Sequence, residues 1–252
     1  MEAKLFSKKG NKLCLYNLLL KIVHFFYPNY CANCEVLLKE NEPNCFCKNC
    51  WGKIKIITES CKKCGKPVIT GDGLCNDCKK TKKFYYEKIK VLGLYEGVLK
   101  KAIHLYKYES RWKIASDFVE LIIKNINIEY VKENDLIIPV PLTKDKLYKR
   151  GFSQTLLICK ELGRYYNIPV YDNILLKTRE TPSQSTLTRE QRLKNVLGSF
   201  EINIKYKSKI LGKNILLFDD VYTTGTTVRE CSRVLKENGA KRVNVLTLAR
   251  GI

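Results

Sequence analysis

The chain has 252 residues, of which 45% are hydrophobic and 28% charged, which excludes an intrinsically disordered protein and allows one large domain plus a small module. With 46 Lys and Arg against 25 Asp and Glu, the net charge of +21 indicates a polyanionic partner (nucleic acid, phosphorylated ligands or an anionic membrane surface) or merely a lysine-rich solvated surface. Only two histidines are present, which excludes His-rich metal sites.

Residues 1–27 are expected to form an amphipathic helix. Leucine, isoleucine and phenylalanine side chains recur at helical spacing between residues 15 and 26. Polar residues interrupt this stretch and no small-residue cleavage site follows, so a signal peptide is not favoured. The stretch is also too short and too polar to span a bilayer. We expect a cytoplasmic protein with no transmembrane segment, whose helix docks on its own core rather than on a membrane surface.

Eight of the 12 cysteines form four CxxC pairs, which predict two structural zinc sites within residues 28–80. The ligand candidates are Cys31, Cys34, Cys47, Cys50, Cys61, Cys64, Cys75 and Cys78. Two residues between thiolates let one turn present both sulfurs to one ion, and two such turns complete a closed tetrahedron of four thiolates. Zinc is favoured over disulfides and over an iron–sulfur cluster. The spacing leaves open whether ligands pair within each unit or across units.

From residue 88 to residue 252, strands alternate with helices, which predicts an α/β domain with a mostly parallel sheet covered on both faces. The expected strands are 90–95, 136–140, 215–218 and 243–248, and the expected helices are 99–106, 112–124, 153–166 and 226–238. Ligands of such sheets bind beyond the carboxyl ends of the strands. We therefore expect the functional site at that edge.

The segment 215–227 combines the residues that a ribose 5-phosphate site needs. Four apolar residues lead to Asp219 and Asp220, whose carboxylates can accept hydrogen bonds from vicinal hydroxyls or help to hold Mg²⁺. A loop and a helix N-terminus follow, and their backbone N–H groups and hydroxyls suit a phosphate. The loop residues are Thr223, Thr224, Gly225, Thr226 and Thr227. An acidic strand end with a capped helix accounts for only part of this pattern.

This segment resembles the signature of type I phosphoribosyltransferases, and the whole chain is similar to the ComF family of ComFC type, which is also catalogued as amidophosphoribosyltransferase-like. The similarity rests on the Cys pairs with Trp51 and on four further motifs. These are Ile138-Pro-Val-Pro141, Lys149-Arg-Gly-Phe-Ser-Gln154, Thr181-Pro-Ser-Gln184 with Arg189-Glu-x-Arg192, and Leu246-Thr-Leu-Ala-Arg250. The family usually has Asn where Ser153 stands. The resemblance implies a phosphoribosyltransferase-like sheet flanked by helices, with an N-terminal double zinc ribbon.

The resemblance also implies roles for matching residues. Asp219 and Asp220 would contact the ribose hydroxyls of phosphoribosyl pyrophosphate (PRPP) and serve catalysis, and the loop 223–227 would hold the 5-phosphate. Pyrophosphate would lie at the loop that contains Val140 and Pro141 and leads to Lys144. Arg179 would begin the basic loop that closes over PRPP, and Mg²⁺ would bridge pyrophosphate to ribose.

The family is associated with natural transformation, so the resemblance implies a role in DNA uptake with single-stranded DNA and a helicase partner. The alternative is an active phosphoribosyltransferase that uses PRPP and an unidentified acceptor. A structural zinc adaptor ranks last, because the carboxylate signature is intact. The chain begins Met1-Glu2-Ala3 and offers no N-terminal Cys nucleophile, so no glutaminase activity is expected.

Overall fold

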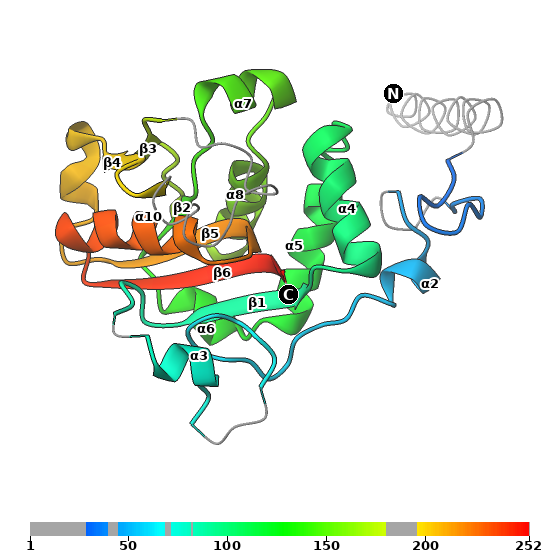
Figure 1. The fold of residues 1–252 in the computed structure, drawn as a ribbon. Helices are drawn as coiled ribbons and strands as arrows, with labels where there is room; N and C mark the ends of the chain where they lie inside the picture. Colours follow the sequence, from blue (N-terminus) through cyan, green and yellow to red (C-terminus); the bar gives the residue numbers. More distant parts are fainter. Residues whose placement is uncertain (1–28, 40–44, 69–71, 82, 180–195, 252) are drawn as a thin grey trace, which may run out of the picture. The chain divides into compact units, whose positions relative to one another are not determined.

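The structure is a computed structural model that describes residues 29–39, 45–68, 72–81, 83–179 and 196–251 (Figure 1). The chain divides into two compact units, residues 1–53 and 54–252. The amphipathic helix expected over residues 1–27 lies outside the described residues. Within the described segments, no helix is both long enough and apolar enough to cross a membrane.

Two cysteine-containing ribbons, whose first cysteines Cys31 and Cys61 are 30 residues apart, have the same backbone conformation at their first turn. We call residues 29–53 the first ribbon and residues 56–81 the second ribbon. In the first, the carbonyl of Cys31 accepts a hydrogen bond from the Glu35 amide at 2.9 Å, and in the second, Cys61 accepts from Gly65 at 2.8 Å. Glu35 and Gly65 both have left-handed backbone, with φ of 60° and 69°. The second ribbon thus has glycine where the turn requires positive φ, whereas the first ribbon has a glutamate in this unfavourable backbone conformation.

The described residues contain all the strands and helices that the sequence predicts between residues 88 and 252, together with several short elements that it does not predict. The helices are α2 (Lys48–Trp51), α3 (Asn76–Lys79), α4 (Gly97–Tyr108), α5 (Ile114–Asn125), α6 (Ile128–Lys132), α7 (Lys144–Arg150), α8 (Gln154–Tyr166), the 3-10 helix η2 (Ile204–Lys209) and α10 (Thr226–Glu237). The strands are β1 (Ile89–Leu94), β2 (Leu136–Pro139), β3 (Leu175–Lys177), β4 (Phe200–Ile202), β5 (Asn214–Tyr222) and β6 (Arg242–Arg250).

A four-stranded sheet in the order β1-β6-β5-β2 organises the second unit, and every pairing in it is parallel (Figure 1). The register aligns Leu94 of β1 and Tyr222 of β5 with Arg250 of β6. The carboxyl ends of these three strands therefore meet at one edge. β3 and β4 form a separate antiparallel pair.

The sheet is buried on both faces, which confirms the predicted layering. Ile215 and Leu217 belong to one buried cluster with Val228 of α10. Leu216 and Phe218 alternate with them and are also fully buried, so they face the opposite layer. On that side α8 packs against β2 and β5, and α5 packs against α8 and β1.

Strand β5 extends four residues beyond the predicted strand 215–218. Asp219 pairs with Thr247 of β6, and Tyr222 pairs with Arg250. A prediction from apolar runs stops at the first carboxylate, whereas the backbone ladder continues regardless of side-chain polarity. The two carboxylates therefore stand on a rigid strand rather than in the loop after it.

The second ribbon is part of the core of the second unit. Its four CxxC cysteines belong to the same buried cluster as Ile89 and Val91 of β1. The Ile89 amide donates to the carbonyl of Lys62 at 2.8 Å. A Cβ at Gly65 would lie 2.1 Å from Cγ2 of Val91, so the ribbon turn contacts the strand with no space for a side chain.

Candidate functional site: two thiolate clusters and a ribose-phosphate edge

Two clusters of four cysteine thiols fit structural metal sites. In each, the sulfur atoms lie within 4.8 Å of one another, and the clusters are Cys31, Cys34, Cys47 and Cys50, and Cys61, Cys64, Cys75 and Cys78. The Sγ atoms of Cys64 and Cys75 are 3.6 Å apart, close to the roughly 3.8 Å expected between sulfurs on a tetrahedral zinc ion. The structure thereby answers the pairing question that the spacing left open: ligands pair within each unit.

The loop after β5 leads into the N-terminus of α10, at the edge where the sequence predicts a phosphate site. Gly225 is the N-cap residue and has left-handed backbone with φ of 75°. No side chain caps this helix. The hydroxyls of Thr224 and Thr226 lie 2.8 Å apart beside it. An uncapped helix N-terminus with adjacent hydroxyls offers several donors to one anion.

A small hollow at this loop collects most of the predicted ribose-phosphate residues. Its volume is about 20 Å³. It is lined by Asp219, Val221, Tyr222, Thr223, Gly225, Thr226, Thr227 and Val228. The structure therefore brings a carboxylate and the threonine-rich loop to one point.

The two carboxylates of β5 have different surroundings. Burial and the neighbouring Asp220 carboxylate raise the pKa of Asp219 to about 7. Asp220 instead pairs with the ammonium of Lys107, whose Nζ lies 2.7 Å from Oδ1. Only 16% of the Lys107 side chain and 14% of the Asp220 side chain are exposed. Burial disfavours the charge on Lys107, but the Asp220 carboxylate outweighs it, and the pKa of Lys107 is raised.

Sequence reasoning missed the cations around these carboxylates. Lys107 lies at the end of α4, 113 residues before its partner Asp220, and no local pattern marks such a pair. The positive charge of Lys177 in β3 favours the ionised form of Asp219 and partly offsets the upward shift of the Asp219 pKa. Both lysines become recognisable only once the sheet brings distant segments together.

The other predicted ligand residues lie at separate points. Val140 is buried after β2, and its amide donates to the carbonyl of Phe218 at 2.8 Å, which fixes the loop that includes Pro141 beside β5. Lys144 opens α7. The Arg179 guanidinium donates to the carbonyl of Leu197 at 2.5 Å. The basic loop expected to close over PRPP spans residues 179–192, and all of it after Arg179 lies outside the described residues.

Replacing Gly225 with alanine should cost more than its positive φ alone. A Cβ there would lie 2.1 Å from the hydroxyl oxygen and 2.2 Å from Cζ of Tyr222, a fully buried ring. Gly212 is a matched control, because its φ is 68° and a Cβ there would have nothing within 4 Å. We expect Gly212→Ala to cost about 1 kcal/mol and Gly225→Ala to cost at least about 2 kcal/mol more. Chemical denaturation measures both, and equal losses would contradict the contact.

Models of two known protein families match separate parts of the chain. The model described as "Double zinc ribbon domain" matches residues 22–79. The model described as "Phosphoribosyl transferase domain" matches residues 171–252. The first match includes both thiolate clusters, and the second includes β5, the loop after it and α10.

Curated relatives are similar over most of their length. The chain is 28% identical to Competence protein F of Haemophilus influenzae, over 89% of this chain and 98% of that protein. It is 28% identical to DNA utilization protein YhgH of Escherichia coli K12, over 81% and 89%. Competence protein ComFC of Streptococcus pneumoniae is 29% identical, over 86% and 92%.

Proposed function

Because the chain belongs to the ComF family, whose phosphoribosyltransferase domain and double zinc ribbon it shares, we propose that it binds PRPP or ribose 5-phosphate and acts in DNA uptake. The ligand proposal rests on the arrangement at the carboxyl end of strand β5. β5 delivers two carboxylates beside an uncapped helix N-terminus with threonine hydroxyls.

The chemistry of this edge supports a ribose 5-phosphate. Ionised Asp219 and Asp220 can accept hydrogen bonds from the two ribose hydroxyls. The loop 223–227 can donate to the 5-phosphate from backbone and hydroxyl groups. Because the two sets are adjacent on the chain, one ligand that carries both a diol and a phosphate can engage both.

For intact PRPP, the loop containing Val140 and Pro141, with Lys144, would receive the pyrophosphate, and Arg179 would stand at the start of the closing loop. Mg²⁺ fits the oxygen donors of Asp219 and Asp220 and those of the ligand. When bound, this ion would neutralise pyrophosphate charge. The roles of these side chains are proposals that single substitutions can separate.

Affinity for ribose 5-phosphate should rise with pH in the absence of metal. Asp219 has a pKa of about 7, so the carboxylate form that accepts ribose hydrogen bonds becomes dominant between pH 6 and pH 8. We expect about a tenfold gain over that range, measured by calorimetry. The phosphate itself gains charge near pH 6. Asp219→Asn retains that contribution, so its binding should be weaker and its pH profile flatter. Equal slopes in the two proteins would contradict the role of Asp219.

The DNA part of the proposal is supported by charge and by the relatives. The net charge is +21, and the relatives are described as competence and DNA utilization proteins. We propose that the protein binds single-stranded DNA and cooperates with a helicase. Affinity for a 20-nucleotide strand should fall at least about tenfold between 50 and 200 mM salt. Affinity independent of salt would contradict this proposal.

Transformation frequency tests the function in the natural host. In a strain that lacks the native gene, the native gene should restore transformation and Asp219→Asn should not. Asp172→Asn is the matched control, because Asp172 is an exposed acid outside the hollow. Full restoration by Asp219→Asn would separate the ribose-phosphate site from DNA uptake.

The second candidate is an active phosphoribosyltransferase, which the intact carboxylate pair and loop favour. Release of pyrophosphate from PRPP, measured with ammonia and with nucleobases as acceptors, tests this candidate. Release that requires Asp219 and Asp220 would support it. Absence of release with every acceptor, from a protein that binds PRPP, would favour the binding role.

A further inference from the structure

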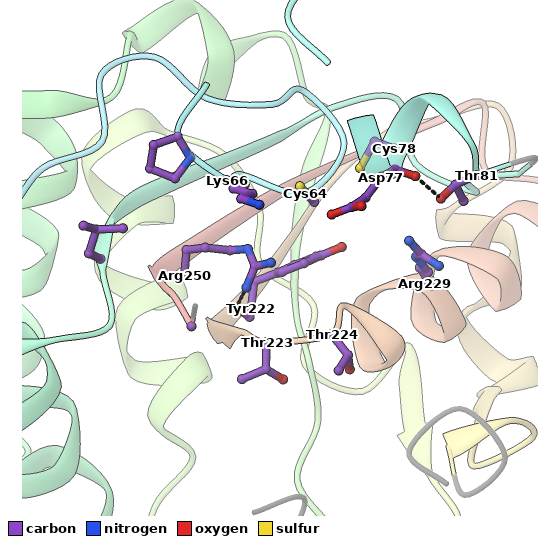
Figure 2. A pocket seen from close by; sticks show the side chains of 13 residues that line it. Cys64, Lys66, Asp77, Cys78, Thr81, Tyr222, Thr223, Thr224, Arg229 and Arg250 are labelled. Atoms are coloured by element: carbon purple, nitrogen blue, oxygen red, sulfur yellow. Dashed lines mark hydrogen bonds between the residues drawn. The ribbon is translucent and has the colours of Figure 1, made fainter. Parts of the chain in front are cut away.

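A cavity of about 600 Å³ separates the second ribbon from the carboxyl edge of the sheet (Figure 2). The ribbon contributes Lys66 and Asp77 to one wall, and Thr223 and Thr224 form the opposite wall. Asp219 and Asp220 do not line it. The cavity thus borders the hollow at the N-terminus of α10 and shares Tyr222 and Thr223 with it, whereas Asp219 lines only the hollow.

Two guanidinium groups converge on this cavity from different elements, Arg229 of α10 and Arg250 at the end of β6. Each is held by an aromatic ring: Arg229 lies 4.7 Å from the centre of the Phe84 ring, and Arg250 lies 5.2 Å from that of Tyr222. Stacking on a ring restricts the orientation of the guanidinium group, and its N–H groups can still donate hydrogen bonds in the guanidinium plane.

These guanidinium groups are incompletely satisfied within the described part of the chain. The Nε atoms of Arg229 and Arg250 are both buried and have no hydrogen-bond acceptor. Arg250 uses Nη1 to donate to the carbonyl of Tyr222 at 3.3 Å, and the Arg229 guanidinium donates to the Tyr86 hydroxyl. Buried donors without acceptors are costly. Both side chains also line the cavity, where their remaining N–H groups can donate to an anionic ligand.

The lining also limits what kind of anion fits. Lys66, Arg229 and Arg250 face a single acid, Asp77, but a zinc ion with four thiolates carries a formal charge of −2 beside them. Net charge is therefore small, and directional hydrogen bonds must select the anion. Apolar groups, including Pro67, complete the lining and suit a flat ring. The volume is typical of sites for ligands of nucleotide size.

We propose that this cavity binds a nucleoside monophosphate unit, with its phosphate on Arg229 and Arg250 and its base against the apolar wall. The unit can be a free nucleotide or the phosphorylated end of a strand. The site uses the second ribbon as a wall, so it requires that ribbon to be folded. It adjoins the proposed ribose-phosphate site at Tyr222 and Thr223 but does not include its carboxylates, so we expect the two ligands to bind together.

The test uses the zinc-loaded full chain with saturating ribose 5-phosphate, which occupies the loop of α10. Calorimetry then measures dTMP, and short thymidine strands with and without a 5′-phosphate. We expect dTMP or the phosphorylated strand to bind, and binding of either one supports the site. Arg229→Gln and Arg250→Gln should each weaken binding about tenfold or more, while Arg111→Gln, at an exposed arginine outside the cavity, should not.

A third variant, at a surface residue of the cavity, tests the site even if the arginine variants misfold. Lys66 is exposed, so Lys66→Glu should leave zinc content and thermal stability unchanged and still weaken nucleotide binding. Displacement of dTMP by ribose 5-phosphate would overturn the inference, because the nucleotide would then occupy the ribose-phosphate site. Native-like affinity in all three cavity variants, or absence of binding at millimolar nucleotide, would also overturn it. If ribose 5-phosphate does not bind at all, arginine-dependent nucleotide binding still supports the cavity.

Discussion

We expect Cys61→Ser to lower the midpoint of thermal unfolding by at least about 10 °C and Cys31→Ser to leave the main transition unchanged. Cys61 is fully buried and belongs to the same cluster as Val91 and Val245 of the sheet. Every residue of that cluster comes from the second unit, residues 54–252. Structural zinc contributes on the order of 10 kcal/mol to small ribbons, and one kcal/mol shifts a domain of this size by about 2–4 °C.

Circular dichroism during heating, with zinc content measured on the same samples, tests this expectation. Each variant should lose one of two zinc ions, but only the loss at the second ribbon should lower the main transition. Cys159→Ser, at a buried cysteine outside both clusters, serves as a control for the cost of a buried hydroxyl. An unchanged midpoint in zinc-depleted Cys61→Ser protein would show that the second ribbon is not required by the core.

Neighbouring aspartates should respond in opposite directions to the same substitution. Asp219→Asn should stabilise the protein by on the order of 2 kcal/mol at pH 8, because it removes a carboxylate disfavoured by burial and by Asp220. Asp220→Asn should destabilise it by about 2–4 kcal/mol, because Lys107 loses its close partner in a largely buried position. Both should impair ligand binding, since each removes a predicted ribose contact.

The pH dependence identifies the cause of the Asp219 effect. Its pKa is about 7 in the folded protein and near 4 in an unfolded chain, so the folded state disfavours the carboxylate. The gain from Asp219→Asn should therefore be largest above pH 7 and shrink as the pH falls toward 4. Urea denaturation at pH 5 and pH 8 measures this change. A gain independent of pH would contradict the electrostatic origin.

A double variant identifies the cause of the Asp220 effect. Lys107→Met removes the ammonium that Asp220→Asn would leave unpaired. The combination should be more stable than Asp220→Asn alone, because no buried charge then lacks its partner. Additive losses would show that the two side chains stabilise the fold independently.

The site was predictable from sequence where chemistry is local. The segment 215–227 carries a strand, two acids, a glycine and a helix start within 13 residues, so pattern alone identifies it. The ribbons are equally local, because four pairs recur with one period. Pairing within each ribbon required the structure, since spacing does not say which turns face one another.

What sequence could not provide depends on long-range contacts and on short polar elements. Lys107 meets Asp220 only because α4 packs beside the sheet edge. Helix α7 has no buried residue, so it lacks the apolar period by which a helix is recognised. The cavity beside the second ribbon is lined from ribbon, strand end and helix, and no single segment predicts it.

Calorimetric titration of PRPP with Mg²⁺ into zinc-loaded protein tests the central claim most directly. The native protein should bind one equivalent, and Asp219→Asn/Asp220→Asn should lose binding while Asp172→Asn retains it. Folding of the double variant is verified by its zinc content and circular dichroism. Absence of binding to native, folded protein would contradict a ribose-phosphate site at the end of β5. Unchanged binding by the double variant would place the ligand elsewhere.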